Sequence, residues 1–126
     1  MRSAITPDGA VAVGPYSSAV IGNGMLYCSG QTPLDPETKT LVGGGVAGQT
    51  RQCFANLFAV LDAAQLTPDD VTKVNVYLTD MNYFAEMNSA YAEQFAEPYP
   101  ARTTIGVAAL PLGAEVEIEL IAQLRG

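Results

Sequence analysis

The residues best suited to chemistry in this sequence are one arginine and a row of glutamates near the C-terminus. Glu115, Glu117 and Glu119 alternate with apolar residues, which places three carboxylates on one face of a predicted strand. Taken alone, this row is typical of the solvent-exposed face of an antiparallel strand. Arg102 follows a proline-stiffened turn, where it either pairs with one of the glutamates or grips a ligand carboxylate through two parallel hydrogen bonds. Residue chemistry leaves both roles open.

The sequence contains no histidine, which excludes Ser-His and Cys-His nucleophile pairs and every His-ligated metal site. Cys28 and Cys53 are far apart and form no C-x-x-C motif, so we expect two buried free thiols and no metal site. Ser29 ends a predicted strand without a nearby base, and we expect it to form hydrogen bonds rather than act as a nucleophile. Tyr16 follows a Gly-Pro turn and is expected to pack, with its hydroxyl at the edge.

A glycine-rich segment over residues 43–48 satisfies the pattern G-x-G-x-x-G and precedes a predicted helix. The residues before it form a poor buried strand, and the chain is too short for two βαβ halves. No Gly-Lys-Ser/Thr sequence follows, so a phosphate-binding P-loop is excluded as well. We interpret the segment as a flexible glycine loop, and no nucleotide cofactor is expected.

Turn residues and hydrophobic periodicity divide the chain into alternating strands and helices. In chain order they are strands over 18–21 and 25–29, a helix over 46–64, a strand over 74–78, a helix over 83–95, and strands over 105–110 and 115–124. Asp80 is expected to cap the second helix. The order β-β-α-β-α-β-β predicts one α+β domain over residues 1–126, with two helices packed on one face of a mixed sheet.

The composition points to self-association. Hydrophobic residues make up 48% of the 126 residues and charged residues only 15%, whereas an average domain has about 25% charged residues. Part of the surface is therefore expected to be buried against other copies of the chain. The net charge of −7 and the six scattered basic residues argue against a nucleic-acid partner. No apolar run reaches the roughly 18 residues of a membrane span, and the first nine residues suggest no secretory signal, so we expect a cytoplasmic protein.

Six stretches of the sequence, taken together and in order, resemble the Rid family (RidA/YjgF) of enamine/imine deaminases. They cover residues 14–20, 27–31, 49–64, 74–80, 99–104 and 110–119. No single stretch is decisive, but the ordered set is highly specific and covers nearly the whole chain.

The resemblance implies a chorismate-mutase-like (YjgF-type) α+β protomer. It implies that three protomers pack their sheets into a central β-barrel, with sites in the clefts between neighbouring subunits of this homotrimer. It also implies hydrolysis of 2-iminopropanoate, 2-iminobutanoate and the related 2-aminoacrylate tautomers to 2-oxo acids and ammonia, without a cofactor.

The resemblance also assigns roles by position. Arg102 matches the family's substrate-carboxylate arginine, and Glu117, expected beside it, matches the glutamate that positions the attacking water. Thr104 stands where some members have a cysteine whose backbone helps to bind the substrate. The family's other pocket positions fall on Tyr16, Ser29 and Asn88.

Two other functions remain compatible with the sequence. The same fold and cleft would serve a binding or regulatory module that senses a small carboxylate, because fold does not fix function. The combination of Arg102 with Glu117 favours catalysis, since a carboxylate-binding site has no use for a second acid. Ribonuclease or translation-inhibitor activity, attributed to some Rid relatives, is disfavoured by the acidic charge.

Overall fold

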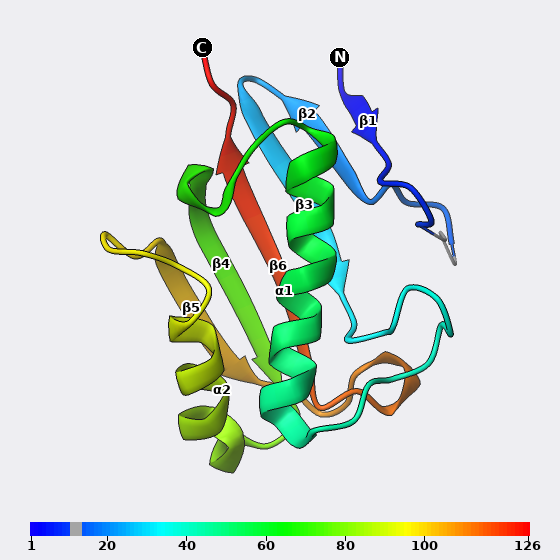
Figure 1. Cartoon of the computed structure of the whole chain (residues 1–126), viewed down its shortest axis with the longest axis vertical. Helices are drawn as coiled ribbons and strands as arrows, with labels where there is room; N and C mark the ends of the chain where they lie inside the picture. The colour runs from blue at the N-terminus through cyan, green and yellow to red at the C-terminus, as the bar shows by residue number, and fades with distance from the viewer. Residues whose placement is uncertain (11–13) are drawn as a thin grey trace.

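The computed structural model describes residues 1–10 and 14–126, in which two α-helices lie against one six-stranded sheet (Figure 1). The strands are β1 (Ser3–Ile5), β2 (Ala19–Gly22), β3 (Met25–Gln31), β4 (Val71–Leu78), β5 (Ala101–Gly106) and β6 (Val116–Gln123). The helices are α1 (Gly45–Ala63) and α2 (Phe84–Ala92), with short 3-10 turns η1 (Pro68–Asp70), η2 (Met81–Tyr83) and η3 (Pro111–Gly113).

The sheet is mixed, as predicted. Its strand order is β1-β2-β3-β6-β4-β5, so the last two strands of the chain are separated by β4. β4 and β5 run parallel, whereas the other neighbouring strands pair antiparallel. Both helices lie on the same face of the sheet (Figure 1), which confirms the α+β arrangement. β5 is consequently an edge strand, and this position matters for the site below.

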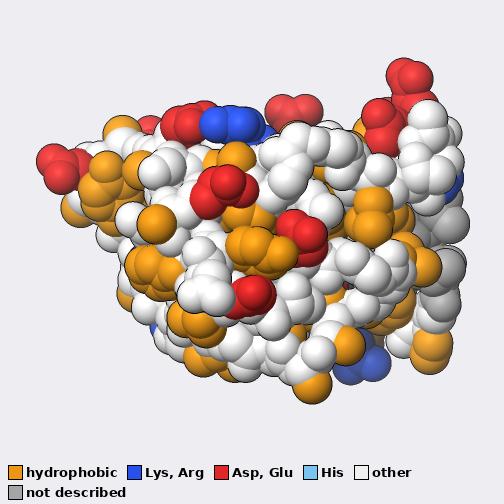
Figure 2. Space-filling view, turned by 90° about the horizontal axis from the view of Figure 1, so that it is seen from below, with side chains coloured by type: hydrophobic (Ala, Val, Ile, Leu, Met, Phe, Trp, Pro, Cys, Tyr) orange, Lys and Arg blue, Asp and Glu red, His pale blue; other side chains and the backbone are white. Residues whose placement is uncertain are grey.

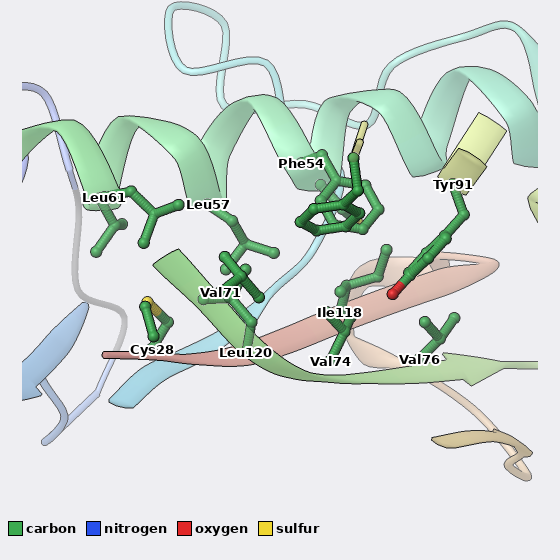
Figure 3. Close-up of a cluster of buried hydrophobic side chains, with 14 of the residues drawn as sticks. Cys28, Phe54, Leu57, Leu61, Val71, Val74, Val76, Tyr91, Ile118 and Leu120 are labelled. Carbon is green, nitrogen blue, oxygen red and sulfur yellow. The ribbon is translucent and has the colours of Figure 1, made fainter. Parts of the chain in front are cut away.

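The core lies between the helices and the sheet (Figure 3). Val116, Ile118 and Leu120 of β6 are almost fully buried, because alternate residues of a strand face the same side. Above them, aromatic rings of α1, α2 and the segment after α2 pack at centroid distances of 5.4–6.0 Å; they belong to Phe54, Phe58, Tyr91 and Phe95. Each fully buried side chain of this size stabilises the fold by roughly 1.5–3 kcal/mol. The cluster thus fixes α2 against α1.

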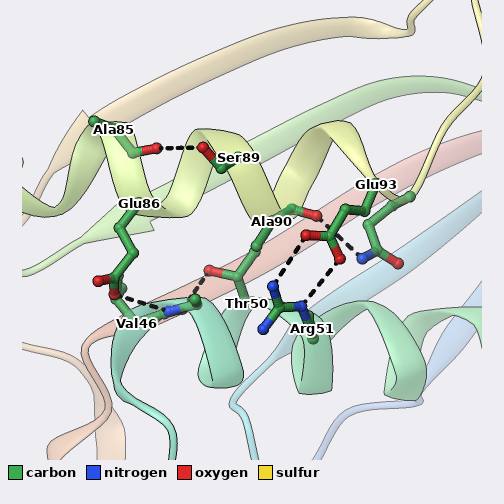
Figure 4. A network of polar contacts seen from close by, with 10 residues as sticks. Val46, Thr50, Arg51, Ala85, Glu86, Ser89, Ala90 and Glu93 are labelled. Atoms are coloured by element: carbon green, nitrogen blue, oxygen red, sulfur yellow. Dashed lines mark hydrogen bonds and ion pairs between the residues drawn. The ribbon is translucent and has the colours of Figure 1, made fainter.

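Polar contacts set the register of the two helices (Figure 4). The carboxylate of Glu86 on α2 accepts a hydrogen bond from the backbone N–H of Ala47, at 3.1 Å. This N–H belongs to the first turn of α1, where backbone donors lack helical partners and a negative charge is favoured. Arg51 and Glu93 form two further hydrogen bonds of 3.1 and 3.0 Å, although both side chains are exposed and water weakens the pair. α2 is therefore held at both ends.

The structure differs from the sequence-based prediction in several element boundaries and in one strand that was not predicted. The strand predicted over 105–110 lies over Ala101–Gly106 instead, and most of the apolar segment that suggested it is loop. The second helix ends at Ala92 rather than at 95, and β1 was not predicted at all. β1 and β5 are short edge strands that carry no apolar alternation. Asp80 does act as a cap, accepting a hydrogen bond from the N–H of Asn82 at 2.9 Å, but it caps η2.

Neither helix in the described part of the chain has the length and apolar character needed to cross a membrane.

Candidate active site

Arg102 lies on the helix-facing side of the edge strand β5. It pairs with the buried Val74 of β4, and its guanidinium points toward α2. There its Nη1 donates a hydrogen bond of 2.7 Å to Oδ1 of Asn88. Its Cζ lies 4.6 Å from the ring centroid of Tyr91 and 5.5 Å from that of Phe84, within the range of cation–π attraction. Among the described residues no carboxylate pairs with Arg102, so pairing with the glutamate row is not observed within the chain.

A cleft of about 440 Å³ opens beside this guanidinium. It is lined by Asn88, Tyr91, Ala92, Tyr99, Pro100 and Arg102. A guanidinium has five N–H donors, and Asn88 uses one of those on Arg102. The remaining donors suit the planar, bidentate geometry of a carboxylate. The cleft can therefore bind a small anion between β5 and α2.

Two buried hydroxyl groups lie on the helix side of the sheet. The Oγ1 of Thr104 and the hydroxyl of Tyr91 have no hydrogen-bond partner among the described residues. Thr104 pairs with Val76 on the helix side of the sheet, and the Tyr91 hydroxyl points toward the sheet (Figure 3). An unsatisfied buried hydroxyl costs about 1–3 kcal/mol. Within the described chain, Arg102 thus has two unpaired buried hydroxyl groups on its side of the sheet, one on its own strand and one on the ring that it contacts.

Glu117 lies on the opposite face of the sheet. Its neighbours Val116 and Ile118 are buried under the helices, so the glutamate between them faces away from α1 and α2. Burial, together with the nearby charge of Glu119, raises the pKa of the Glu117 carboxyl. Glu119 in turn accepts a hydrogen bond of 2.6 Å from the hydroxyl of Tyr77, which raises the pKa of Tyr77 to about 12.

Ser29 lies in β3, next to the strand β6 that carries Glu117, and Tyr16 precedes β2. The Ser29 hydroxyl donates a hydrogen bond of 2.6 Å to the backbone oxygen of Ser17. The pairing of β3 with β6 is irregular between Cys28 and Gln31, and there the Glu117 carboxylate lies over Gly30. Tyr16 is 51% exposed and lines, with Gly30, a second cleft of about 320 Å³.

The predicted site residues therefore form two groups within one chain. Arg102, Asn88 and Thr104 gather at the β5 edge on the helix side, whereas Tyr16, Ser29 and Glu117 lie around β3 and β6. β4 separates β5 from β6, and the two charged residues point to opposite faces. Within one chain Glu117 does not lie beside Arg102. The resemblance implies a site between neighbouring subunits, so the expectation that the two residues meet stays a prediction.

Sequence reasoning missed the rings around Arg102 and the glycine beneath Glu117. Tyr91 and Phe84 lie in the predicted helix over 83–95, and no site role was assigned to them. Gly30 follows Ser29 in the sequence and was likewise assigned no role. The sequence carries no local signal that these α2 residues lie close to Arg102, because only the tertiary fold brings the two elements together.

Both thiols are free and buried, as predicted. Burial raises the pKa of Cys28 to about 12, and it raises that of Cys53 further. Cys53 donates a hydrogen bond to the backbone oxygen of Gln31 at 3.2 Å. Within residues 1–10 and 14–126, no three Cys, Asp or Glu side chains converge in a way that would hold a metal ion.

Comparison with known proteins identifies the family. The sequence profile described as Endoribonuclease L-PSP matches residues 7–124, nearly the whole chain. A solved structure from Yersinia pestis, described as a conserved Rid family protein of unknown function, is 44% identical. It superposes with a TM-score of 0.94 and covers 98% of this chain and all of its own. The chain belongs to the endoribonuclease L-PSP (YjgF/Rid) family.

Rid relatives carry differing names. A RutC family protein of Pyrococcus horikoshii is 48% identical over 110 residues, which is 87% of each chain. The 2-iminobutanoate/2-iminopropanoate deaminase of Bos taurus is 43% identical over 117 residues, which covers 93% of this chain and 85% of the bovine one. The Rid family thus includes imine deaminases, while its profile bears the name of a ribonuclease.

Proposed function

We propose that this chain is a cofactor-free deaminase that hydrolyses 2-imino acids, such as 2-iminopropanoate, 2-iminobutanoate and the tautomeric 2-aminoacrylate, to 2-oxo acids and ammonia. The observation that carries the proposal is the guanidinium of Arg102, which is held by Asn88 and Tyr91 and has no carboxylate partner within the described chain. The bovine relative, named for this activity, supports the choice of substrate.

The proposed reaction needs a fixed imine carbon, a placed water and a path by which both protons of that water reach the nitrogen. Arg102 binds the substrate carboxylate, and neutralising this negative charge makes the adjacent imine carbon more electrophilic. Glu117 holds the water and removes its proton as the water oxygen bonds to that carbon. Glu117 passes this proton to the imine nitrogen, which gives a carbinolamine. The carbinolamine hydroxyl then gives up its own proton, which reaches the amino group by the same carboxylate as the C–N bond breaks, so that ammonia leaves and the 2-oxo acid remains. The raised pKa of Glu117 brings its basicity closer to that of a group working near neutral pH.

Tyr16, Ser29, Asn88 and Thr104 complete the proposed pocket. Asn88 fixes the guanidinium and the backbone of Thr104 contacts the substrate, whereas Tyr16 and Ser29 close the side that carries Glu117. Arg102 and Glu117 face opposite sides of one sheet, so a site that contains both takes them from two copies of the chain. We therefore propose a homotrimer of chorismate-mutase-like protomers around a central β-barrel, with intersubunit sites.

Two further observations support assembly through the face that the helices leave open. This face includes Tyr27, which is 44% exposed, together with Tyr77 and Ile121. Both helices cover the other side (Figure 1), and only 15% of the residues of the chain are charged. Apolar and aromatic area of this kind is stabilised by burial against another copy. We propose a cytoplasmic location for the assembly.

The activity is tested by generating 2-iminopropanoate and 2-iminobutanoate in situ with an amino-acid oxidase and following their decay. We expect faster decay with the wild-type protein and no acceleration with Arg102→Ala. Arg2→Ala is the matched control, because it removes an exposed arginine next to β1, at the opposite edge of the sheet from β5, and should retain activity. Full activity of Arg102→Ala would refute the role of Arg102. Failure of the wild type to accelerate decay, with retained binding of 2-oxobutanoate, would favour a carboxylate-binding or regulatory module.

Shared sites are tested by mixing inactive variants. Arg102→Ala and Glu117→Gln each lack one half of the proposed site. When they are unfolded together and refolded as mixed assemblies, about a quarter of the intersubunit sites should carry both wild-type residues and regain activity. No regain of activity, in mixtures shown to contain both variants, would exclude sites shared between copies.

Ribonuclease activity is the alternative suggested by the family description. The net charge of −7 disfavours this activity. On the face of the molecule shown in Figure 2, acidic side chains lie among hydrophobic ones, and basic side chains lie only near the rim. A binding assay with single-stranded RNA at two salt concentrations tests this alternative, since tight and strongly salt-dependent binding would favour it.

A further inference from the structure

Gly30 stands where a side chain would collide with the Glu117 carboxylate. A Cβ built on Gly30 would lie 2.6 Å from Oε2 of Glu117, 3.1 Å from its Cδ and 3.4 Å from its Cγ. These are the three atoms nearest to that Cβ, and all belong to Glu117. Carbon and oxygen atoms that are not bonded normally stay well beyond 3 Å apart. The carboxylate thus occupies the space that a side chain at position 30 would fill.

The backbone gives no other reason for a glycine here. Positive φ values occur at Gly9, Gly24, Gly44, Gly45 and Gly113, but not at Gly30. Gly30 belongs to β3 and is exposed, so a methyl group would not enter the core. A glycine within a strand destabilises it by roughly 0.5–1 kcal/mol relative to alanine. The local fold would therefore be at least as stable with alanine at this position.

The pairing of β3 with β6 explains how the two residues meet. Cys28 pairs with Leu120 and Gln31 pairs with Ile118, so the regular register is lost between Cys28 and Gln31. Such an irregularity bends the strand and re-aims neighbouring side chains. Because Glu117 directly precedes Ile118, its side chain lies beside this distorted segment and folds over Gly30.

We infer that Gly30 is a positioning residue for Glu117: its missing side chain sets where the carboxylate lies on the open face of the sheet. The inference rests on the proposed function, because Glu117 is taken there as the group that holds the attacking water. The next carboxylate on the same face of β6, that of Glu119, is held separately by a 2.6 Å hydrogen bond from the Tyr77 hydroxyl. Glu119 therefore does not occupy the position over Gly30.

The test compares the wild type with Gly30→Ala and with the control Gly22→Ala. Gly22 ends β2, has no positive φ, and has no atom within 4 Å of the position that a Cβ would take. In Gly30→Ala the carboxylate must rotate away, and a displacement of about 1 Å in a catalytic group costs up to about 100-fold in rate. We expect kcat for 2-iminobutanoate to fall by about 10- to 100-fold, with KM changed less than about twofold because Arg102 is untouched. Gly22→Ala should match the wild type in both constants.

Two results would overturn the inference. An unchanged kcat in Gly30→Ala would show that Gly30 does not control Glu117. A raised KM together with weaker binding of 2-oxobutanoate would show that the methyl group obstructs the ligand itself. If Gly30→Ala fails to fold, the double variant Gly30→Ala/Glu117→Ala should fold, since the colliding atoms are gone; failure of the double variant would also overturn the inference.

A spectroscopic readout separates this inference from the proposed function. In a sample labelled with ¹³C at glutamate carboxyls, the Glu117 resonance is assigned by its loss in Glu117→Gln. It should shift in Gly30→Ala and stay in place in Gly22→Ala. If the wild type proves to have no deaminase activity, the proposed function fails, and this shift still decides whether Gly30 positions the carboxylate.

Discussion

The guanidinium of Arg102 and the ring of Tyr91 are in contact across two elements, with Cζ 4.6 Å from the ring centroid. Arg102 lies on the edge strand β5, and Tyr91 lies on α2. α2 is itself fixed to α1 by the aromatic cluster and by Glu86 at the first turn of α1. The guanidinium is thus held by a helix that contacts within the chain fix in place, which limits the side-chain freedom that Arg102 loses on binding a ligand.

Replacing Tyr91 separates the role of its ring from that of its hydroxyl. Tyr91→Phe removes a buried hydroxyl that has no partner in the described structure, so we expect the free energy of unfolding to rise by about 1 kcal/mol. Tyr91→Leu removes the ring under the guanidinium, and KM should exceed that of Tyr91→Phe by roughly 3- to 30-fold, the range of a cation–π contact. Urea unfolding and steady-state kinetics measure the two effects. Destabilisation of Tyr91→Phe by more than about 1 kcal/mol would mean that the hydroxyl is satisfied.

Asn88→Asp tests whether Arg102 binds an anion. The new carboxylate would replace the amide oxygen that lies 2.7 Å from Nη1 of Arg102, and it would neutralise the cation. We expect KM for an anionic 2-imino acid to rise by about tenfold or more, while the melting temperature stays the same or increases. Asn82→Asp, at an exposed position of η2 outside the cleft lining, provides a control for added negative charge. Unchanged affinity in Asn88→Asp would contradict a carboxylate-binding role for Arg102.

The raised pKa of Glu117 predicts how stability depends on pH. Because the folded-state pKa of this carboxyl exceeds its unfolded value, its contribution to stability is fully present below the unfolded pKa and is lost as pH rises through the folded pKa. Glu117→Gln removes the group that titrates, and with it this loss of stability at higher pH. The variant should therefore be more stable than the wild type at pH 7, by less than about 1 kcal/mol because solvent screens a half-buried group, and the difference should shrink at acid pH. Thermal melts at pH 4 and pH 7 check the sign, and a difference that grows toward acid pH would contradict it.

The two thiols should be unreactive in the folded protein. Burial raises the pKa of Cys28 to about 12 and that of Cys53 further, so the reactive thiolate is rare at pH 8 and lies behind packed side chains. We expect at least about a hundredfold slower modification by a disulfide reagent in buffer than in guanidinium chloride. Cys28→Ala and Cys53→Ala assign any residual reaction. Rapid modification of the native protein would show that the β3 or α1 region opens readily.

Much of the protomer follows from local pattern. The three- and four-residue spacing of apolar residues predicts α1 almost to the residue, because a helix of this length must bury one continuous face. The alternation of Glu117 with Ile118 predicts that the carboxylate faces away from the core, and the structure agrees. The lack of histidine also narrows the chemistry to arginine, carboxylate, hydroxyl and backbone groups.

Only the tertiary structure decided which residues contact Arg102 and Glu117. Periodicity assigns a residue to a face of its own strand, but not to a neighbour in the sheet, because strand order is set by contacts between residues far apart in the chain. The parallel pairing of β5 with β4 puts Arg102 beneath α2, and the pairing of β6 between β3 and β4 turns Glu117 toward Gly30. Within one chain, Arg102 and Glu117 therefore lie on opposite faces of the sheet.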